Sequence, residues 1–464
     1  MTDESAKCFV ASRTDGLGER LRGLINAMIL AEHFGVEYKF IWPERGAGSQ
    51  QHHAIVRARA TFNRTFLGLH HIEKITPEEY PPLTGRLQPP AEIRALLASP
   101  VKGIAVTQEP IDRLIDLREL KNLRGKYRRA FYRIRFTKEA LLAVESATIV
   151  PLPRNAVAVH LRAGDIIYGS FRMSSAATHK AACYPVVKQL IMRLKAEGKN
   201  PIIFGQDQTV CRLLADKFGL VLATDIVTYD DQLCAALSEI VVMSRCDEIY
   251  AGASGFSILA GLIGDKKRQS PAGEQTPQEV IDCIAGDKEL DDPASPLPAL
   301  QRAYAYYMIA YVGIDAVADD IVVAALGQAL DYDPINAFYA VNKANLEARA
   351  GNLTAAEATL KQAIDADDLA VFDQTSLYQV IRRTIYTNRL KERLAIPPCL
   401  DNLTGYATPD YPFITYVAAL TAYLRRQPAE AARFAAQAVA GNSDTVRFRH
   451  LLDLCPAVKT VAVT

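Results

Sequence analysis

Cysteine is scarce in this sequence: eight of the 464 residues are cysteines, and none forms a Cys-x-x-Cys pair. Such pairs are typical of redox and zinc sites, and the cysteines and histidines show no other spacing typical of metal ligands. Thiols that are few and scattered are typical of a reducing compartment. We therefore expect reduced cysteines, no metal ion and a cytoplasmic protein, with a peripheral position at the inner membrane surface as the alternative.

The sequence also lacks a long apolar run and an excess of charge of either sign. No stretch reaches the roughly 18 apolar residues that cross a bilayer, and residues 1–7 lack the regions of a signal peptide. The net charge of +1 argues against the broad basic surface of a nucleic-acid-binding protein. A basic run at 124–135 fits either a solvated helix face or a contact with an anionic acceptor or membrane. We expect a soluble protein without a transmembrane segment or a nucleic-acid partner.

The first 285 residues alternate between strand-like and helix-like segments. A strand at 8–12, a helix at 20–34 closed by Gly35, and a strand at 38–42 form a βαβ unit, which is the unit of a parallel sheet. After a break near 140–155 come strands at 156–161, 201–205, 220–224 and 248–251, and helices at 185–197, 207–218, 230–245 and 255–263. We therefore predict an α/β fold with two Rossmann-like lobes, at 1–150 and 151–290, that bind ligands at the carboxyl ends of the strands.

A proline-rich connection at 264–298, with a short helix at 277–284, leads to an alanine-rich region without strand signals. Within that region, 324–333 aligns with 358–367 at an offset of 34 residues, and 416–438 resembles a further copy. This period is typical of tetratricopeptide repeats, so we predict an all-α helical-repeat domain at 299–464; an unrelated helical bundle is the alternative. Repeat stacks expose concave surfaces, so we expect this domain to bind a partner, or to cap the catalytic part and self-associate.

Three motifs lie where a predicted strand meets a helix. The first is at 156–165, where an apolar strand ends in His160, Arg162 and Asp165. His160 and Arg162 share one face of a continuing strand, and the planar guanidinium of an arginine makes paired bonds to a diphosphate. A strand end with a surface Arg–Asp pair is the alternative.

The other two motifs open helices. At 252–257 (Gly-Ala-Ser-Gly-Phe-Ser) small and hydroxyl residues precede an apolar helix, whose free N–H groups and dipole favour phosphate; simple helix capping by Ser254 is the alternative. At 15–20 (Asp-Gly-Leu-Gly-Glu-Arg) the glycines Gly16 and Gly18 allow the backbone to approach a ligand closely. Glu19 in the same turn is a candidate general base. Together the three motifs indicate a cleft between two Rossmann-like lobes.

In this order the motifs resemble those of the fucosyltransferase superfamily, which includes α-1,2- and α-1,6-fucosyltransferases and protein O-fucosyltransferases. The resemblance covers about residues 8–265 and includes Phe-Gly-Gln-Asp at 204–207. It implies a GT-B fold, GDP-fucose as the donor, inversion at the anomeric carbon and no metal. It also implies that Arg162 binds the diphosphate and that Asp207 lies near the guanine. The donor-binding residues that we predict are Gly16, Gly18, Arg20, His160, Arg162, Asp207, Ser254, Gly255, Phe256 and Ser257.

The expected reaction is the inverting transfer of a sugar to a hydroxyl of a glycan or protein acceptor. Arg162 would offset the charge that develops on the leaving nucleoside diphosphate, and Glu19, Asp15 or Asp165 would be the general base. The predicted catalytic residues are thus Arg162, Glu19 and Asp165. Ala253 differs from the residue usual in the family, so another nucleotide sugar, used in surface-polysaccharide synthesis, is one alternative. A non-catalytic nucleotide-sugar-binding scaffold whose repeats bind other proteins is a second alternative.

Overall fold

Three parallel strands form the first sheet of the computed structural model, which describes residues 6–44, 56–83, 87–116, 123–367, 372–387, 394 and 396–455. β1 (Cys8–Ala11) lies between β2 (Glu37–Phe40) and β3 (Gly103–Val106). The connecting helix α1 (Leu17–Phe34) ends at Gly35, whose φ of 70° places it in the left-handed region that glycine tolerates. The predicted βαβ unit is thus confirmed, with α1 beginning at residue 17 rather than 20.

Five parallel strands form the second sheet, in the order β6-β5-β4-β7-β8. The predicted strands β4 (Ala156–Leu161) and β7 (Glu248–Ala251) are confirmed at both ends, whereas β6 (Val221–Leu222) is shorter than predicted because α11 (Ala223–Ile226) begins directly after it. Parallel strands require crossover connections, which are helical here. The remaining elements are β5 (Asn200–Gly205), β8 (Arg268–Gln269), α9 (Tyr184–Ala196), α10 (Gln208–Phe218), α12 (Gln232–Arg245) and α13 (Gly255–Gly264).

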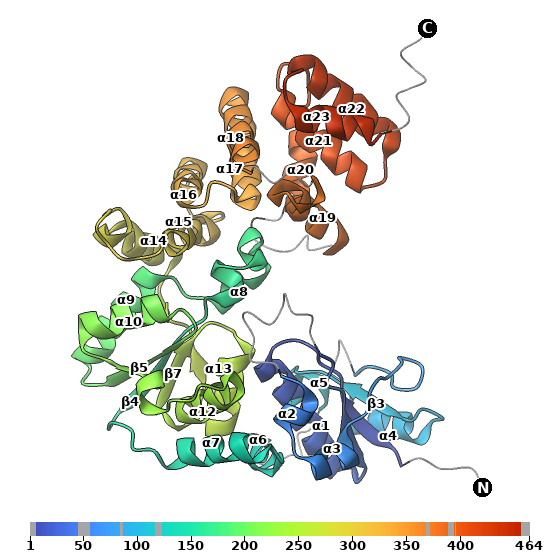
Figure 1. Cartoon of the computed structure of the whole chain (residues 1–464), viewed down its shortest axis with the longest axis vertical. Coiled ribbons are helices and arrows are strands. Elements are labelled where there is room, and N and C mark those ends of the chain that lie inside the picture. Colours follow the sequence, from blue (N-terminus) through green and yellow to red (C-terminus); the bar gives the residue numbers. More distant parts are fainter. Residues whose placement is uncertain are drawn as a thin grey trace. The chain divides into compact units, whose positions relative to one another are not determined.

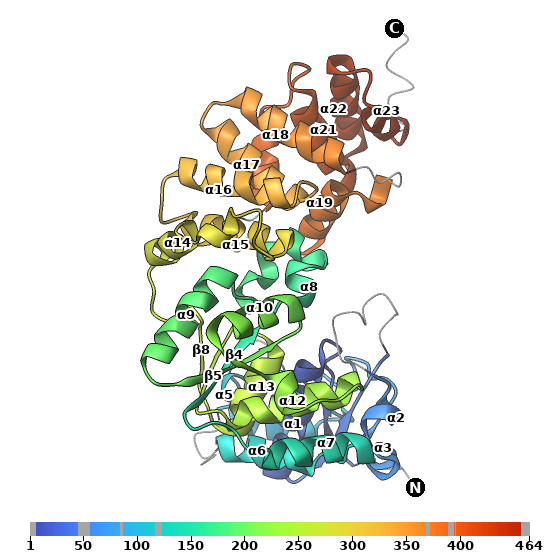
Figure 2. The same ribbon diagram turned by 60° about the vertical axis from the view of Figure 1, so that its left-hand side comes forward.

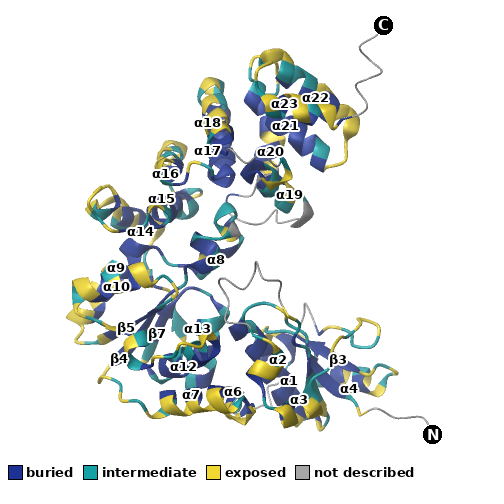
Figure 3. Cartoon of the chain, in the orientation of Figure 1, coloured by how far each residue is buried: buried dark blue, intermediate teal, exposed yellow. Residues whose placement is uncertain are grey.

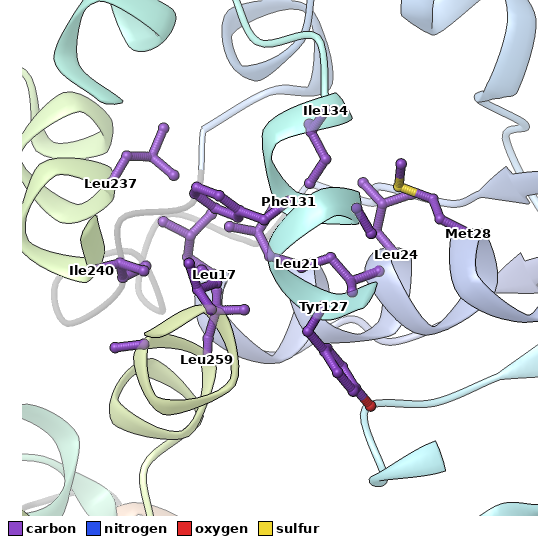
Figure 4. Close-up of a cluster of buried hydrophobic side chains, with 14 of the residues drawn as sticks. Leu17, Leu21, Leu24, Met28, Tyr127, Phe131, Ile134, Leu237, Ile240 and Leu259 are labelled. Carbon is purple, nitrogen blue, oxygen red and sulfur yellow. The ribbon is translucent and has the colours of Figure 1, made fainter. Parts of the chain in front are cut away.

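A common apolar core joins the helices of the two sheets. Figure 4 shows side chains of α1, α6 (Leu123–Arg133), α12 and α13 pointing toward one another. Leu21, Phe131, Leu237 and Leu259 contribute one side chain from each helix, and none of them is exposed to solvent. In Figure 3 much of α1 is dark blue, the colour of buried residues. The other helices before β4 are α2 (Ala58–Thr61), α3 (Arg64–His70), α4 (Pro90–Ala98), α5 (Ile111–Leu114) and α7 (Lys138–Ile149).

The chain divides into two compact units. The sheet unit comprises Met1–Arg162, Lys180–Ala182 and Leu190–Pro271, and it contains both sheets. The helical unit comprises Ala163–His179, Cys183–Gln189 and Ala272–Thr464. The domain boundaries predicted at 150, 290 and 299 remain predictions.

Helices make up the C-terminal part of the helical unit (Figures 1 and 2). α15 packs with α16, α17 with α18 and α21 with α22, and the two aligned ten-residue segments fall on α16 and α18, each the second helix of its pair. The all-α region is therefore confirmed, and its assignment to tetratricopeptide repeats stays a prediction. The helices are α14 (Pro277–Ala285), α15 (Ala299–Gly313), α16 (Asp319–Tyr332), α17 (Ala337–Arg349), α18 (Leu353–Ala366), α19 (Ser376–Thr387), α20 (Ile396–Gly405), α21 (Pro412–Leu424), α22 (Pro428–Gly441) and α23 (Val446–Asp453). Over the described ranges, no helix combines the length and apolarity needed to cross a membrane.

Candidate donor-binding site

The strand orders of the two sheets mark where a ligand would bind. In the first sheet β2 and β3 lie on opposite sides of β1, and in the second β5 and β7 lie on opposite sides of β4. Open α/β sheets bind ligands outside the carboxyl ends of their strands at such reversals. The residues that follow β1, β4 and β7 contain the three predicted motifs, and β7 lies next to β4. That these motifs bind a ligand remains a prediction.

The turn that opens α1 is held from within by a buried arginine. Only 2% of Arg20 is exposed, and its guanidinium donates hydrogen bonds to the carbonyl oxygens of Thr14, Asp15 and Pro43 at 2.8, 2.8 and 2.9 Å. It also lies over the ring of Trp42, 5.0 Å from its centroid. Arg20 therefore shapes the loop that carries Gly16; a direct contact of Arg20 with the donor remains a prediction.

Two predicted motifs meet at Gly18 and Gly255. A Cβ atom on Gly18 would lie 2.6 Å from the carbonyl carbon and oxygen of Gly255 and 2.7 Å from the nitrogen of Phe256. A Cβ atom on Gly255 would lie 2.6 Å from Oε1 of Glu19. The first turns of α1 and α13 thus touch backbone to backbone. Gly18 and Gly255 therefore allow the two helices to approach each other closely. The approach of a ligand to Gly16 and Gly18 remains a prediction.

Glu19 lies in this junction and has a charged neighbour. Its Oε2 accepts a hydrogen bond of 2.9 Å from Nη1 of Arg22, and the two side chains are 17% and 6% exposed. Burial lowers the pKa of Arg22, while the charge of Glu19 opposes that shift. The carboxylate therefore lies at the start of α13 and is compensated by a buried cation. Its role as the general base remains a prediction.

The loop after β3 is fixed by α1 through two residues that the sequence analysis did not single out. Nη2 of Arg22 donates to the carbonyl oxygen of Gln108 at 2.6 Å. Nδ2 of Asn26 donates to the carbonyl oxygens of Thr107 and Glu109 at 2.8 and 2.7 Å. A signal for both was present, because they are polar residues four apart on a helix whose other members are mostly apolar.

His160 connects the end of β4 to the start of α13. Its ring stacks on that of Phe256, with the centroids 5.4 Å apart and the planes at 18°. Burial, and to a smaller extent the charge of Arg162, lower the pKa of His160 to about 3. Its Nδ1 is buried and has no hydrogen-bond partner among the described residues. His160 is therefore a neutral imidazole whose Nδ1 is buried without a partner among the described residues.

The hydroxyl groups at the start of α13 are engaged within the helix. The Oγ of Ser254 accepts from the N–H of Ser257 at 3.4 Å, and the Oγ of Ser257 lies 3.1 Å from the carbonyl oxygens of Gly252 and Ser254. The capping role considered for Ser254 is therefore present. The N–H groups of Gly255 and Phe256 have no acceptor within the helix, because the first turn of an α-helix lacks one. They are the groups of α13 that suit an anion.

The two charged residues after β4 belong to different units. Arg162 directly follows β4, is partly buried, and is the last residue of its segment of the sheet unit. Asp165 lies in the first turn of α8 (Gly164–Ile167), in the helical unit. The sheet unit thus brings together Gly16, Gly18, Glu19, His160, Gly255 and Phe256, and Arg162 lies two residues after His160 in the chain.

Two carboxylates lie near the end of β5, and the sequence analysis identified one of them. Asp207 is the N-cap of α10 and accepts from the N–H of Val210 at 3.1 Å. Glu239 of α12 was missed; no hydrogen bond or ion pair joins it to another described residue. Burial raises the pKa of Glu239 to about 7. The charges of both carboxylates act on the buried thiol of Cys211, which places Glu239 near the start of α10.

No grouping of three or more His, Cys, Asp or Glu side chains suited to a metal ion occurs in the described ranges. The expectation that the reaction needs no metal remains a prediction.

Solved fucosyltransferase structures are similar to this chain. The fucosyltransferase NodZ from Bradyrhizobium has a TM-score of 0.33 and 15% sequence identity, over 55% of this chain and 93% of NodZ. A NodZ α-1,6-fucosyltransferase soaked with GDP-fucose has a TM-score of 0.32 and 15% sequence identity, over 55% of this chain and 92% of that structure. POFUT1 in its apo form has a TM-score of 0.32 and 10% sequence identity, over 58% of this chain and 99% of POFUT1. No protein-family model and no curated protein matches the sequence.

Proposed function

We propose that this chain is a metal-independent, inverting glycosyltransferase that moves fucose from GDP-fucose to a hydroxyl of a glycan or protein. The observation that carries the proposal is the meeting of three motifs in the sheet unit, at the Gly18–Gly255 and His160–Phe256 contacts. Two of the motifs follow β1 and β4, at which the strand order reverses, and the third follows β7, the neighbour of β4; such reversals are where these sheets bind nucleotides.

The site separates cationic from neutral groups. With a pKa of about 3, His160 carries no charge at neutral pH, so it cannot offset the charge of a diphosphate. That role falls to Arg162, whose guanidinium suits paired bonds to phosphate oxygens. The N–H groups that open α13 supply a second, uncharged set of donors. The neutral ring of His160, stacked on Phe256, would then lie beside the donor.

Glu239 offers a basis for choosing guanine among the bases. A partly buried carboxylate without a partner among the described residues is costly unless it accepts hydrogen bonds. Guanine presents two adjacent donors, N1–H and the N2 amino group, which match the two oxygens of a carboxylate. Binding of guanine would return the pKa of Glu239 toward its ordinary value, since hydrogen bonds to the charged form favour it. We therefore assign Glu239 to recognition of the guanine base and Asp207 to a position beside the guanine.

The transfer step follows from these assignments. The acceptor hydroxyl gives its proton to a carboxylate, and its oxygen forms a bond to the anomeric carbon. The bond from that carbon to the diphosphate oxygen breaks, and GDP leaves with the electron pair while Arg162 stabilises its developing charge. Glu19, Asp15 and Asp165 are the candidates for the proton-accepting carboxylate. Attack from the side opposite the leaving group inverts the anomeric carbon.

Replacement of Arg162 tests this proposal. We expect Arg162→Ala to lower the rate of GDP release from GDP-fucose by about 10³-fold, the scale of losing a charged group that stabilises a leaving phosphate. Arg162→Lys should recover only part of the rate, because lysine lacks the planar pair of donors. Arg154→Ala is the matched control, since Arg154 is exposed and precedes the same strand.

A thermal-shift series with GDP, UDP, ADP and CMP identifies the nucleotide. Selective stabilisation by GDP is expected, and selectivity for UDP would instead indicate another nucleotide sugar. Binding without release of GDP in the presence of any acceptor would indicate the non-catalytic scaffold. Wild-type turnover in Arg162→Ala would contradict the assignment of the leaving-group site.

A further inference from the structure

α7, in the sheet unit, turns its large aliphatic side chains away from the core. Leu141, Leu142 and Ile149 are 40%, 51% and 82% exposed. The opposite side of the helix, which packs on α12, consists of smaller apolar residues, namely Ala140, Ala143, Val144 and Ala147. A surface helix ordinarily directs its large apolar residues to the core and its polar residues to solvent. α7 reverses this arrangement.

Hydrogen bonds from α12 fix α7 in this orientation. The Oγ of Ser238 donates to the carbonyl oxygen of Ala143 at 3.2 Å. Nη1 of Arg245, at the end of α12, donates to the carbonyl oxygen of Ala147 at 2.7 Å. These bonds set the rotation of α7 about its axis, so its aliphatic side chains remain on the solvent side.

Exposed apolar side chains gather on α6 and α7. Of the twelve large apolar side chains that are exposed in the described ranges, four lie within 132–149, and Ile149 is the most exposed of the twelve. The fourth is Tyr132 of α6, whose hydroxyl shares a hydrogen bond of 3.5 Å with that of Thr148 in α7. In Figure 3 much of α6 and α7 is yellow, the colour of exposed residues. Single exposed apolar residues are ordinary, whereas a group of them marks an interaction site.

The same surface has an excess of positive charge. Between residues 128 and 149, five cations are exposed and only two carboxylates, Glu139 and Glu145. One of the cations, Arg133, is paired with Glu32 of α1 at 2.9 Å and is still 63% exposed. The five cations are Arg128, Arg129, Arg133, Arg135 and Lys138.

The cations and the apolar side chains share the same helix faces. Lys138, Leu142, Glu145 and Ile149 follow one another at intervals of three or four residues, so they form one stripe along the solvent side of α7. On α6, Arg129 lies three residues before Tyr132 and therefore on the same side. The surface thus alternates basic and apolar groups.

An anionic bilayer surface fits this alternation better than a protein does. The buried centre of a protein interface is depleted of charged residues, and here Lys138 lies one turn from Leu142. At a bilayer surface, basic side chains contact lipid phosphates while neighbouring aliphatic side chains enter the boundary of the hydrocarbon region. Affinity then adds the burial of apolar surface to the attraction between opposite charges.

We propose that the solvent side of α6 and α7 binds the surface of a bilayer that contains anionic lipids. Leu142 and Ile149 enter the boundary of the hydrocarbon region, and Arg129 and Lys138 contact lipid phosphates. The basic run at 124–135 then forms part of a membrane-contact surface. This proposal goes beyond the proposed function and does not depend on it.

The test measures binding of the full chain to vesicles by co-sedimentation. Vesicles of phosphatidylcholine are compared with vesicles that also contain phosphatidylglycerol, at low and at high salt. Ile149→Ser removes an apolar contact, and its matched control is Met192→Ser, because Met192 is also exposed (57%) on a helix of the sheet unit. Arg129→Gln removes a cation, and its matched control is Arg113→Gln, since Arg113 is exposed in α5 of the same unit.

We expect binding to the vesicles with phosphatidylglycerol only, and weaker binding at high salt. Ile149→Ser should weaken binding roughly tenfold, because it removes most of a buried aliphatic side chain from the bilayer. Arg129→Gln should weaken it about fivefold, the value of one cation near an anionic surface. Glu145→Gln should strengthen binding, since Glu145 is the carboxylate on the stripe. Both control variants should bind as wild type does.

Three outcomes would overturn the proposal. The first is no binding to vesicles with phosphatidylglycerol, and the second is equal binding to both kinds of vesicle. The third is equal binding by Ile149→Ser and wild type. Self-association without lipid that is lost in Ile149→Ser, together with absence of vesicle binding, would assign the surface to a second copy of the chain. Release of GDP in solution should be unchanged in Ile149→Ser, so the outcome for this surface is read separately from the outcome for the donor site.

Discussion

Replacing Gly18 by alanine tests whether the α1–α13 junction builds the site. The added Cβ atom would lie 2.6 Å from the backbone of Gly255, so the two helices must separate by about 0.8 Å to restore a contact of 3.4 Å. Backbone atoms cannot rotate away as a flexible side chain can, and overpacking of this kind costs about 1–3 kcal/mol. Alanine recovers up to about 1 kcal/mol of helix propensity. If alanine recovers this full amount, the net loss lies between about 0 and 2 kcal/mol, and we expect about 2 kcal/mol because the contact is with backbone atoms.

The assay combines thermal unfolding with GDP binding. For a unit of this size about 2 kcal/mol corresponds to a fall in melting temperature of roughly 4–8 °C. The same displacement moves the start of α13 away from α1, so GDP affinity should fall as well. Gly23→Ala is the control, because it lies on the same helix and its Cβ atom would meet its nearest neighbours at 3.6–3.9 Å, an ordinary contact. That variant should be neutral or slightly more stable.

Equal stability of the two variants, together with unchanged GDP binding in Gly18→Ala, would refute this reasoning. It would mean that the glycine contact neither supports the packing of α1 on α13 nor shapes the ligand site. Loss of stability without loss of GDP affinity would restrict the contact to a packing role.

Two further predictions concern pH. His160 has a pKa of about 3 in the folded chain and 6.5 ordinarily. Between these two pH values the unfolded state binds one more proton than the folded state, so the folded chain loses stability as pH falls below 6.5. His160→Gln should flatten that loss by up to about 1.4 kcal/mol per pH unit, measured by urea unfolding between pH 4.5 and 6.5. Glu239 makes stability depend on pH in the opposite direction. Its pKa of about 7 in the folded chain exceeds the ordinary 4.5, so stability falls as pH rises from 4.5 to 7. Glu239→Gln should therefore be more stable than wild type at pH 8 and lose its preference for GDP over other nucleotides; unchanged nucleotide preference would remove Glu239 from the base site.

Most of the α/β elements could be predicted because their ends carry local signals. Gly35 ends α1, and the apolar run at β4 stops at polar residues, so both boundaries follow from neighbouring residues. β3 gave no such signal: a run of four apolar residues does not distinguish a strand from part of a buried helix. β6 was predicted too long because its last residues join the next helix, a choice that depends on tertiary packing.

The candidate site was predictable in position and less so in its contacts. Sequence places the motifs at strand ends, and parallel topology brings those ends together. It does not say that Gly18 would face Gly255, because that contact depends on how two helices pack across the core. Nor does it reveal that Ser257 would bond to Gly252 rather than to a ligand. Glu239 was missed because a single carboxylate on an amphipathic helix is ordinary in sequence, and only burial distinguishes it.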